Sequence, residues 1–269
     1  AAAGLGFSSL HALRRQALEQ LDALRLKPWA ERVASTPALP PLPAAARPGR
    51  NPELVVTAWT EDVAVAARDA GADRVLLRTF GSSGATRGSG FAPLLPRVAW
   101  ASEVGGYDSL LGIAGLTVGN LGLLRRAAER GGVAADWPLN VLNAHAAAQL
   151  ASMGADFVWA SPELSGRQLA GLAAASPLPV GCVIWGRLEL MVAEQCVLQA
   201  AGPCSRRCAS CSRRAGWWRL RDQKGYEFPV TTDPSGRSHV MNSVTLDLTR
   251  ALDEILASGV AAVRVDFSD

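Results

Sequence analysis

Four of the five cysteines fall within sixteen residues, and this cluster is the strongest chemical signal in the sequence. Seven, three and two residues separate them in turn, so one folded loop can direct all four thiolates toward a common centre. Thiolates are soft ligands, typical of zinc sites and of iron–sulfur clusters. The sequence therefore predicts a metal centre bound by Cys196, Cys204, Cys208 and Cys211.

Three kinds of cysteine site fit this spacing, and the residues favour an iron–sulfur cluster. A disulfide framework is typical of small secreted domains, whereas the rest of this chain can form a large core. Structural zinc prefers paired C-x-x-C motifs, and only Cys208 and Cys211 form one. We therefore expect a [4Fe–4S] cluster, with zinc as the alternative. The fifth cysteine, Cys182, lies in an apolar stretch and is expected to be a small buried hydrophobe.

A basic segment follows the cysteines. Residues 206–224 contain seven basic side chains against one acidic side chain, with Trp217 and Trp218 among them. Arginines interleaved with aromatic rings can bind phosphates while stacking bases, so RNA is the expected partner of this segment. In the alternative interpretation the arginines offset the charge of the thiolates, and one of the two tryptophans faces the core.

The elements that must position these residues follow one repeated order. A helix ends at a glycine suited to the left-handed conformation, and a short apolar strand of the buried parallel type comes next. Helices are expected at residues 61–70, 144–153 and 246–258, and strands at 54–58, 74–77, 97–101, 116–118, 139–142, 157–160, 180–185 and 261–265. About eight parallel strands predict a TIM-barrel-like α/β fold, complete or incomplete, with a cysteine-rich insertion at 196–224; an open doubly wound sheet is the alternative.

Three parts make up the expected domain organisation. Residues 1–36 contain a lead-in helix at 10–26, residues 37–52 form a proline-rich linker, and residues 53–269 form the barrel domain. The glycines of residues 81–90 do not fit a phosphate-binding fingerprint, so we expect a mobile loop there. The chain starts at Ala1 without an initiator methionine, which favours a piece of a longer protein.

Composition excludes several classes of protein. With 49% hydrophobic and 19% charged residues, the 269-residue chain can bury a sizeable core, which excludes wholesale disorder and fibrous folds. The longest uncharged stretches, 137–155 and 168–186, are interrupted by polar residues or by prolines, so no membrane span is predicted. No basic-then-apolar signal pattern is present, and we expect a cytoplasmic protein.

From about residue 54 to residue 269, the sequence resembles the collagenase-like peptidases of family U32. Residues 10–15 are similar to the segment that precedes the second half of long, multi-domain members, which again favours a C-terminal piece. The motifs that carry the resemblance are the cysteine run and residues 139–143, 161–164, 186–191, 222–230, 239–243 and 264–267.

The resemblance implies a redox enzyme more than a protease. Better-understood relatives bind a [4Fe–4S] cluster and hydroxylate a base in RNA, or a quinone precursor, without molecular oxygen, and some draw on prephenate. Cys196, Cys204 and Cys208 match the cluster-binding positions of the family, whereas Cys211 belongs to the pattern of another subgroup and some relatives have a cysteine in place of Glu189. The peptidase alternative finds no Ser-His-Asp or H-E-x-x-H signature here. A third hypothesis is a noncatalytic domain whose cysteine site supports a partner domain.

Residues just after barrel strands point into the active-site mouth, which gives further candidates by position. Each of them also has a structural interpretation, such as a helix cap or a surface ion pair. The catalytic candidates are Glu103, Glu163, Arg187 and His239, and the substrate-binding candidates are Asn140, Asn143, Arg187 and Asn242.

Overall fold

The computed structural model describes residues 6–32, 38–46, 51–80 and 89–267. These divide into two compact units, Ala1–Pro41 and Leu42–Asp269. The first contains helix α1 (Phe7–Ala30), which extends the helix expected at 10–26 in both directions. The predicted linker lies partly outside the described residues, and so does most of the glycine-rich segment, residues 81–88.

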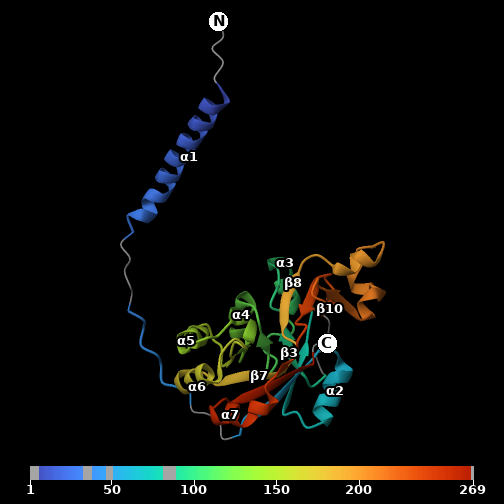
Figure 1. The fold of residues 1–269 in the computed structure, drawn as a ribbon. Helices are drawn as coiled ribbons and strands as arrows, with labels where there is room; N and C mark the ends of the chain where they lie inside the picture. The colour runs from blue at the N-terminus through green and yellow to red at the C-terminus, as the bar shows by residue number, and fades with distance from the viewer. Residues whose placement is uncertain (1–5, 33–37, 47–50, 81–88, 268–269) are drawn as a thin grey trace. The chain divides into compact units, whose positions relative to one another are not determined.

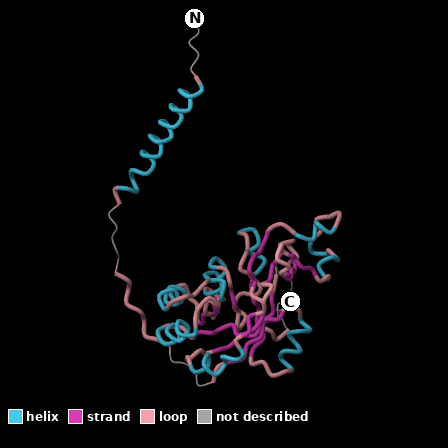
Figure 2. Tube along the Cα trace, viewed as in Figure 1, coloured by secondary structure: helices cyan, strands magenta, loops and turns pink. Residues whose placement is uncertain are grey.

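Eight parallel strands of the second unit close into a ring (Figures 1 and 2). Each strand pairs in parallel with the next along the chain, and the last strand pairs with both the first and the seventh, which closes the barrel. The TIM-barrel-like fold predicted from the sequence is therefore confirmed, and the ring is complete. Its strands are β1 (Glu53–Ala58), β2 (Arg74–Arg78), β3 (Ala92–Leu95), β4 (Thr117–Val118), β5 (Ala134–Ala135), β6 (Phe157–Trp159), β7 (Val180–Gly186) and β13 (Ala262–Phe267).

Helices lie outside the ring, and their ends follow the predicted rule. Gly71, Gly154 and Gly259 follow α2, α5 and α7 with φ of 98°, 96° and 85°, a conformation that glycine adopts without steric cost. The helices of this unit are α2 (Glu61–Asp69), α3 (Ala101–Val104), α4 (Leu121–Ala128), α5 (Ala144–Ser152), α6 (Gly166–Ala175) and α7 (Leu252–Ala257).

Three expected elements are wrong. The strand expected at 97–101 is a loop, because the chain pairs earlier, in a strand that contains Pro93. The strand expected at 139–142 is a 3₁₀ turn that ends at Asn140 in the left-handed conformation, and only Val141 bridges to a neighbour. The helix expected at 246–258 begins only at Leu252, because β12 (Leu246–Asp247) pairs antiparallel with β7.

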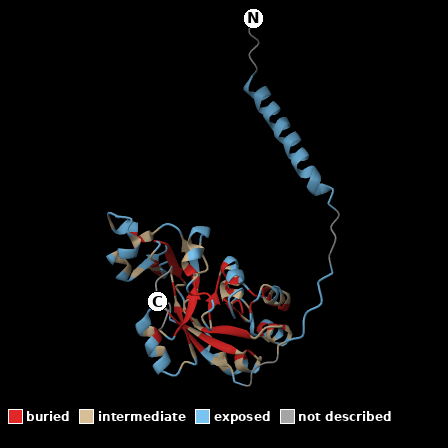
Figure 3. Ribbon diagram, turned by 180° about the vertical axis from the view of Figure 1, so that it is seen from behind, coloured by how far each residue is buried: buried red, intermediate tan, exposed pale blue. Residues whose placement is uncertain are grey.

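Buried residues, red in Figure 3, follow the strands, and the described ones form three apolar clusters. One packs α2 against β1 and β2 through Ala58, Ala64, Val75 and Leu77, and the other two form the main core. The larger lies between the strands and the helices and contains residues such as Leu123, Leu124 and Val158, each fully buried. The smaller gathers Val55, Leu76, Ala92, Leu94, Trp159 and Ala262 from strands all around the ring, so it fills the inside of the barrel. The barrel is a packed core and not a pore, as in other folds of this type.

An insertion follows the carboxyl end of β7. It forms a four-stranded antiparallel sheet in the order β8-β11-β10-β9, and the cysteine-rich segment joins β8 to β9. Because β7 ends at the face where barrel enzymes carry their active sites, the insertion starts at that face. Its strands are β8 (Glu189–Ala193), β9 (Trp218–Arg221), β10 (Glu227–Thr232) and β11 (Ser238–Met241).

Candidate functional site

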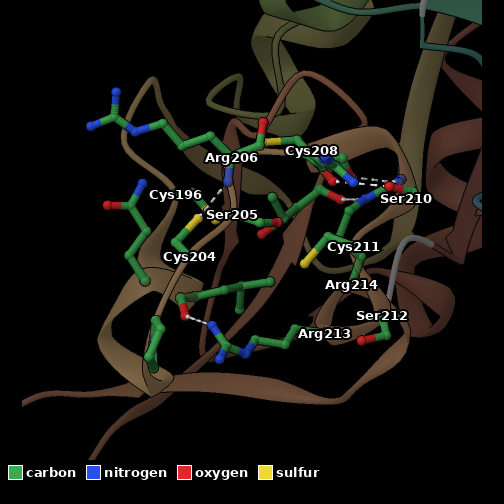
Figure 4. A pocket seen from close by; sticks show the side chains of 15 residues that line it. Cys196, Cys204, Ser205, Arg206, Cys208, Ser210, Cys211, Ser212, Arg213 and Arg214 are labelled. Atoms are coloured by element: carbon green, nitrogen blue, oxygen red, sulfur yellow. Dashed lines mark hydrogen bonds between the residues drawn. The ribbon is translucent and has the colours of Figure 1, made fainter.

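The four clustered cysteines line one pocket. The cavity has a volume of about 250 Å³ and is formed by short 3₁₀ turns, η4 (Val197–Ala201), η5 (Cys208–Ser210) and η6 (Ser212–Ala215). None of the four thiols forms a disulfide, and the side chains surround the hollow in Figure 4. We call Cys196, Cys204, Cys208 and Cys211 with this cavity the cysteine pocket.

The thiols of the cysteine pocket act on one another electrostatically. Burial raises the pKa of Cys208, and the charges of the other three thiolates raise it further. The backbone N–H of Arg206 donates to Cys204 Sγ at 3.4 Å, which partly offsets this repulsion. The thiolate is the form that binds a metal, so ligand binding at Cys208 would require loss of its proton.

The donor set of the cysteine pocket is four thiols around one cavity, the soft ligand type that both zinc and iron–sulfur clusters bind. Within the described ranges, no group of three or more His, Cys, Asp or Glu side chains is placed so that it could hold one metal ion. Tetrahedral zinc needs all its sulfurs about 2.3 Å from one point, whereas an iron–sulfur cluster is larger and takes thiolates around its outside.

Two arginines of the basic segment serve the structure of the loop. Arg213 donates to the carbonyl oxygens of Leu198 and Gly202, at 3.5 and 3.2 Å. Arg214 donates to the carbonyl oxygens of Thr232, Cys208 and Ala209, at 2.9, 3.4 and 3.2 Å. These bonds tie the cysteine-bearing turns together.

The remaining basic side chains face solvent. Trp218 is partly buried and its indole N–H donates to Arg213 O, whereas Trp217 is 85% exposed. Arg219 forms an ion pair with Glu227 at 2.8 Å. Within residues 206–224, four exposed basic side chains form no ion pair with another described residue: Arg206, Arg207, Arg221 and Lys224.

A second polar site lies at the mouth of the barrel. Glu189, the first residue of β8, forms an ion pair with Arg97 at 2.7 Å and accepts a hydrogen bond from Arg78 at 3.4 Å. His239 Nδ1 lies 2.7 Å from Glu189 Oε2, and His239 Nε2 lies 3.5 Å from Asp233 Oδ2. We call these five residues the mouth cluster. They join strand ends of the barrel to two strands of the insertion.

Ion pairing dominates the electrostatics of the mouth cluster. Burial raises the pKa of Glu189, but the hydrogen bond with His239 and the charges of Arg78 and Arg97 outweigh it and hold the pKa at about 2. Burial lowers the pKa of His239, but the bonds with Asp233 and Glu189 outweigh it and the pKa is raised. Both shifts favour the charged forms, so the cluster is a buried network of paired ions.

Deeper in the barrel, Arg264 is fully buried. Its Nη1 donates to Asp136 at 2.7 Å and its guanidinium lies 4.7 Å from the centre of the Trp159 ring. Its Nε and Nη2, together with Thr57 Oγ1 and Arg78 Nε, have no hydrogen-bond partner. Buried polar atoms of this kind usually bind ordered water.

The structure brings only one of the non-cysteine candidates, His239, into the mouth cluster. Arg187 instead donates to the carbonyl oxygens of Asn242 and Ser243, and Glu103 pairs with Arg237. Asn143 caps α5, and Asn140 closes a 3₁₀ turn. Glu163 is exposed.

Sequence reasoning missed most of the mouth cluster and the deeper ion pair. The sequence did contain a signal for them, since charged residues interrupt the apolar runs of the barrel strands β2 and β13. Alternation places them on the inner face, in register with the apolar residues that fill the barrel. The missed residues are Arg78, Arg97, Asp136, Glu189, Asp233, Arg264 and Asp266.

A closed parallel barrel with a four-cysteine insertion after its seventh strand defines the class of this protein. The chain belongs to peptidase family U32, whose sequence profile matches residues 109–267. A search of curated proteins found no match. In the part of the chain that the structure describes, no helix has both the length and the apolar character needed to cross a bilayer.

Solved structures with related folds are distant in sequence. The chain is similar to the U32 peptidase Mk0906, with 9% identity, a TM-score of 0.48, and coverage of 84% of this chain and 97% of that chain. It is also similar to the spore cortex-lytic enzyme SleL of Bacillus megaterium, with 13% identity, a TM-score of 0.36, and coverage of 87% and 74%. A chitinase of Rhizomucor miehei matches at 14% identity, with a TM-score of 0.31 and coverage of 79% and 89%.

Proposed function

We propose that this chain is an iron–sulfur enzyme of family U32, or a domain of one, that hydroxylates a base in RNA without molecular oxygen. The observation that carries the proposal is the cysteine pocket, in which four thiols without disulfides surround one cavity. The resemblance also implies prephenate as a co-reactant, to which we assign no residues.

Cys196, Cys204, Cys208 and Cys211 would hold the cluster. Replacing the C–H bond of a base by a C–O bond, with water as the oxygen source, releases two electrons and two protons. When bound, a [4Fe–4S] cluster would supply one-electron transfer, and a separate one-electron acceptor, a protein or a small molecule, would have to take up the two electrons. The chain's own task is to place the base near the cysteine pocket.

The RNA would contact the exposed part of the basic segment. Arg206 and Arg207 flank the cysteine pocket and are exposed, so they can reach phosphates. Trp217, with 85% of its surface exposed, offers a ring on which a base can stack. Arg213 and Arg214 take no part in this proposal, because their guanidinium groups bind backbone carbonyls.

The mouth cluster would keep the cysteine pocket at the open end of the barrel. Glu189 begins β8, the strand that leads to Cys196, and Arg78 and Arg97 hold its carboxylate. The cofactor-binding loops are then anchored to barrel strands, which is the rigidity that a precise site needs.

Mass spectrometry of nucleosides from cellular RNA tests this function. Cells that lack the protein should lose one hydroxylated base, and the wild-type chain in its natural full-length context should restore it, whereas C208S should not. Cleavage of denatured collagen by the purified protein, with RNA modification unchanged, would instead support a peptidase. Full restoration by C208S would contradict any role of the cysteine pocket in this reaction.

A further inference from the structure

One arginine outside both sites connects three segments of the chain. Arg237 is 4% exposed, and its guanidinium binds both oxygens of Glu103 at 2.7 Å and Glu194 Oε1 at 2.7 Å. Its Nη1 also lies 3.8 Å from Asp233 Oδ2. Glu103 belongs to α3 of the barrel, Glu194 follows β8, and Asp233 begins the turn that contains Arg237.

Parts of this network lie next to cysteines of the pocket. Glu194 is two residues before Cys196 in the sequence. Gly236, the neighbour of Arg237, packs so closely on Cys208 that a Cβ at this position would lie 2.7 Å from the sulfur. On the other side, Ser238 Oγ accepts the N–H of Val197 at 2.9 Å.

The charges make Arg237 necessary for this arrangement. Its guanidinium contacts three carboxylates, and each of these has at least one further partner: the Trp100 indole N–H for Glu194, the Trp100 backbone N–H for Glu103, and His239 for Asp233. Without the cation, buried Asp233 and half-buried Glu103 would lose a counterion, and Glu194, whose side chain is 55% exposed, would lose an ion pair. The contacts that join these segments would be weakened.

We propose that Arg237 is a positioning residue that docks the cysteine-bearing loops onto the barrel through Glu103, so that Cys196 and Cys208 face one cavity. The expectation about retained iron rests on the proposed function, because it requires a bound cluster. Glu103, a barrel residue 134 positions from Arg237 in the sequence, then also contributes to cluster retention, although its side chain carries no sulfur.

Two readouts test the proposal on the full chain: iron retained after anaerobic cluster reconstitution and exposure to a chelator, and the alkylation rate of Cys208 in the metal-free protein. In R237Q we expect Cys208 to be alkylated about tenfold faster, because loss of a charge-assisted hydrogen bond lets the cysteine-bearing loops open more often. We expect a matching loss of retained iron. E103Q should shift both readouts in the same direction. R237K should restore neither fully, because an ammonium cannot bridge the carboxylates as a planar fork does.

R126Q is the matched control, because Arg126 forms a two-bond ion pair with Asp108 outside the insertion. Wild-type readouts in R237Q and E103Q would overturn the proposal. If R237Q does not fold, E103Q still tests docking, and G236A should displace Cys208 with Arg237 intact. If the wild-type chain retains no iron but R237Q still speeds Cys208 alkylation, the proposed function is contradicted and the docking role of Arg237 is supported.

Discussion

At the scale of single residues, Cys208 is the most informative thiol. It lies against Gly236, and the charges of the other three thiolates raise its pKa. A positive centre removes that repulsion when it binds, so loss of this one ligand should weaken the whole site.

We therefore predict that C208S binds much less iron than the wild type after anaerobic reconstitution. C182S is the control, because Cys182 is a buried thiol of a barrel strand whose pKa burial raises to about 11. Iron analysis and the absorption spectrum measure the effect. Equal iron in C208S and C182S would contradict the assignment of ligands.

Glu189 makes a prediction about acid stability. Its carboxyl has a pKa of about 2 in the folded chain against an ordinary value of 4.5. Because the folded-state pKa is lowered, the stabilisation is fully present above pH 4.5 and is lost as the pH falls toward 2. Denaturant unfolding at several pH values should show a steeper loss of stability in this window for the wild type than for E189Q. E227Q, which alters an exposed ion pair, should keep the wild-type slope.

At the scale of elements, the basic segment divides into two functional groups. R206A and R207A should weaken binding of single-stranded RNA and reduce its salt dependence, because they remove exposed phosphate contacts. R214A should instead lower the stability of the insertion by about 1–3 kcal/mol, since three carbonyl oxygens lose their donor. Titrations in low and high salt, with thermal unfolding, separate the two. Equal RNA affinity for R206A/R207A and wild type would remove the RNA assignment.

The sequence predicted elements well where pattern and local geometry agree. Gly71, Gly154 and Gly259 end helices in the left-handed conformation, and the apolar strands that follow lie in the barrel. Prediction failed for β3, because Pro93 makes a strand look like a loop, and for residues 246–258, where antiparallel pairing with β7 delays the helix. Such pairing depends on the closed ring and cannot be read from a local pattern.

At the scale of the whole molecule, the site combines residues that are distant in sequence. Spacing alone grouped the four cysteines. Glu103 became a candidate from its position after the strand expected at 97–101, which the structure does not contain, and its pairing with Arg237 follows only from the barrel and its insertion together. His239 was among the candidates predicted from the sequence, whereas Glu189 and Arg97 were not. Glu189 and Arg97 become recognisable only when the fold brings them together from separate elements.

Metal removal should act on the insertion more than on the barrel. The cysteine turns hold few buried apolar residues, whereas the barrel has three apolar clusters of its own. A chelator under reducing conditions should therefore increase amide hydrogen exchange in residues 194–216 and leave the barrel strands protected. Exchange that rises equally in β1 and β13 would mean that the metal supports the whole fold.

Iron and acid-labile sulfide content after anaerobic purification, together with the absorption and electron paramagnetic resonance spectra, test the central claim most directly. We predict a brown protein with equal amounts of iron and sulfide, one cubane cluster per chain, and loss of both in C208S. A colourless protein that carries zinc, or no metal, after anaerobic reconstitution would contradict the account.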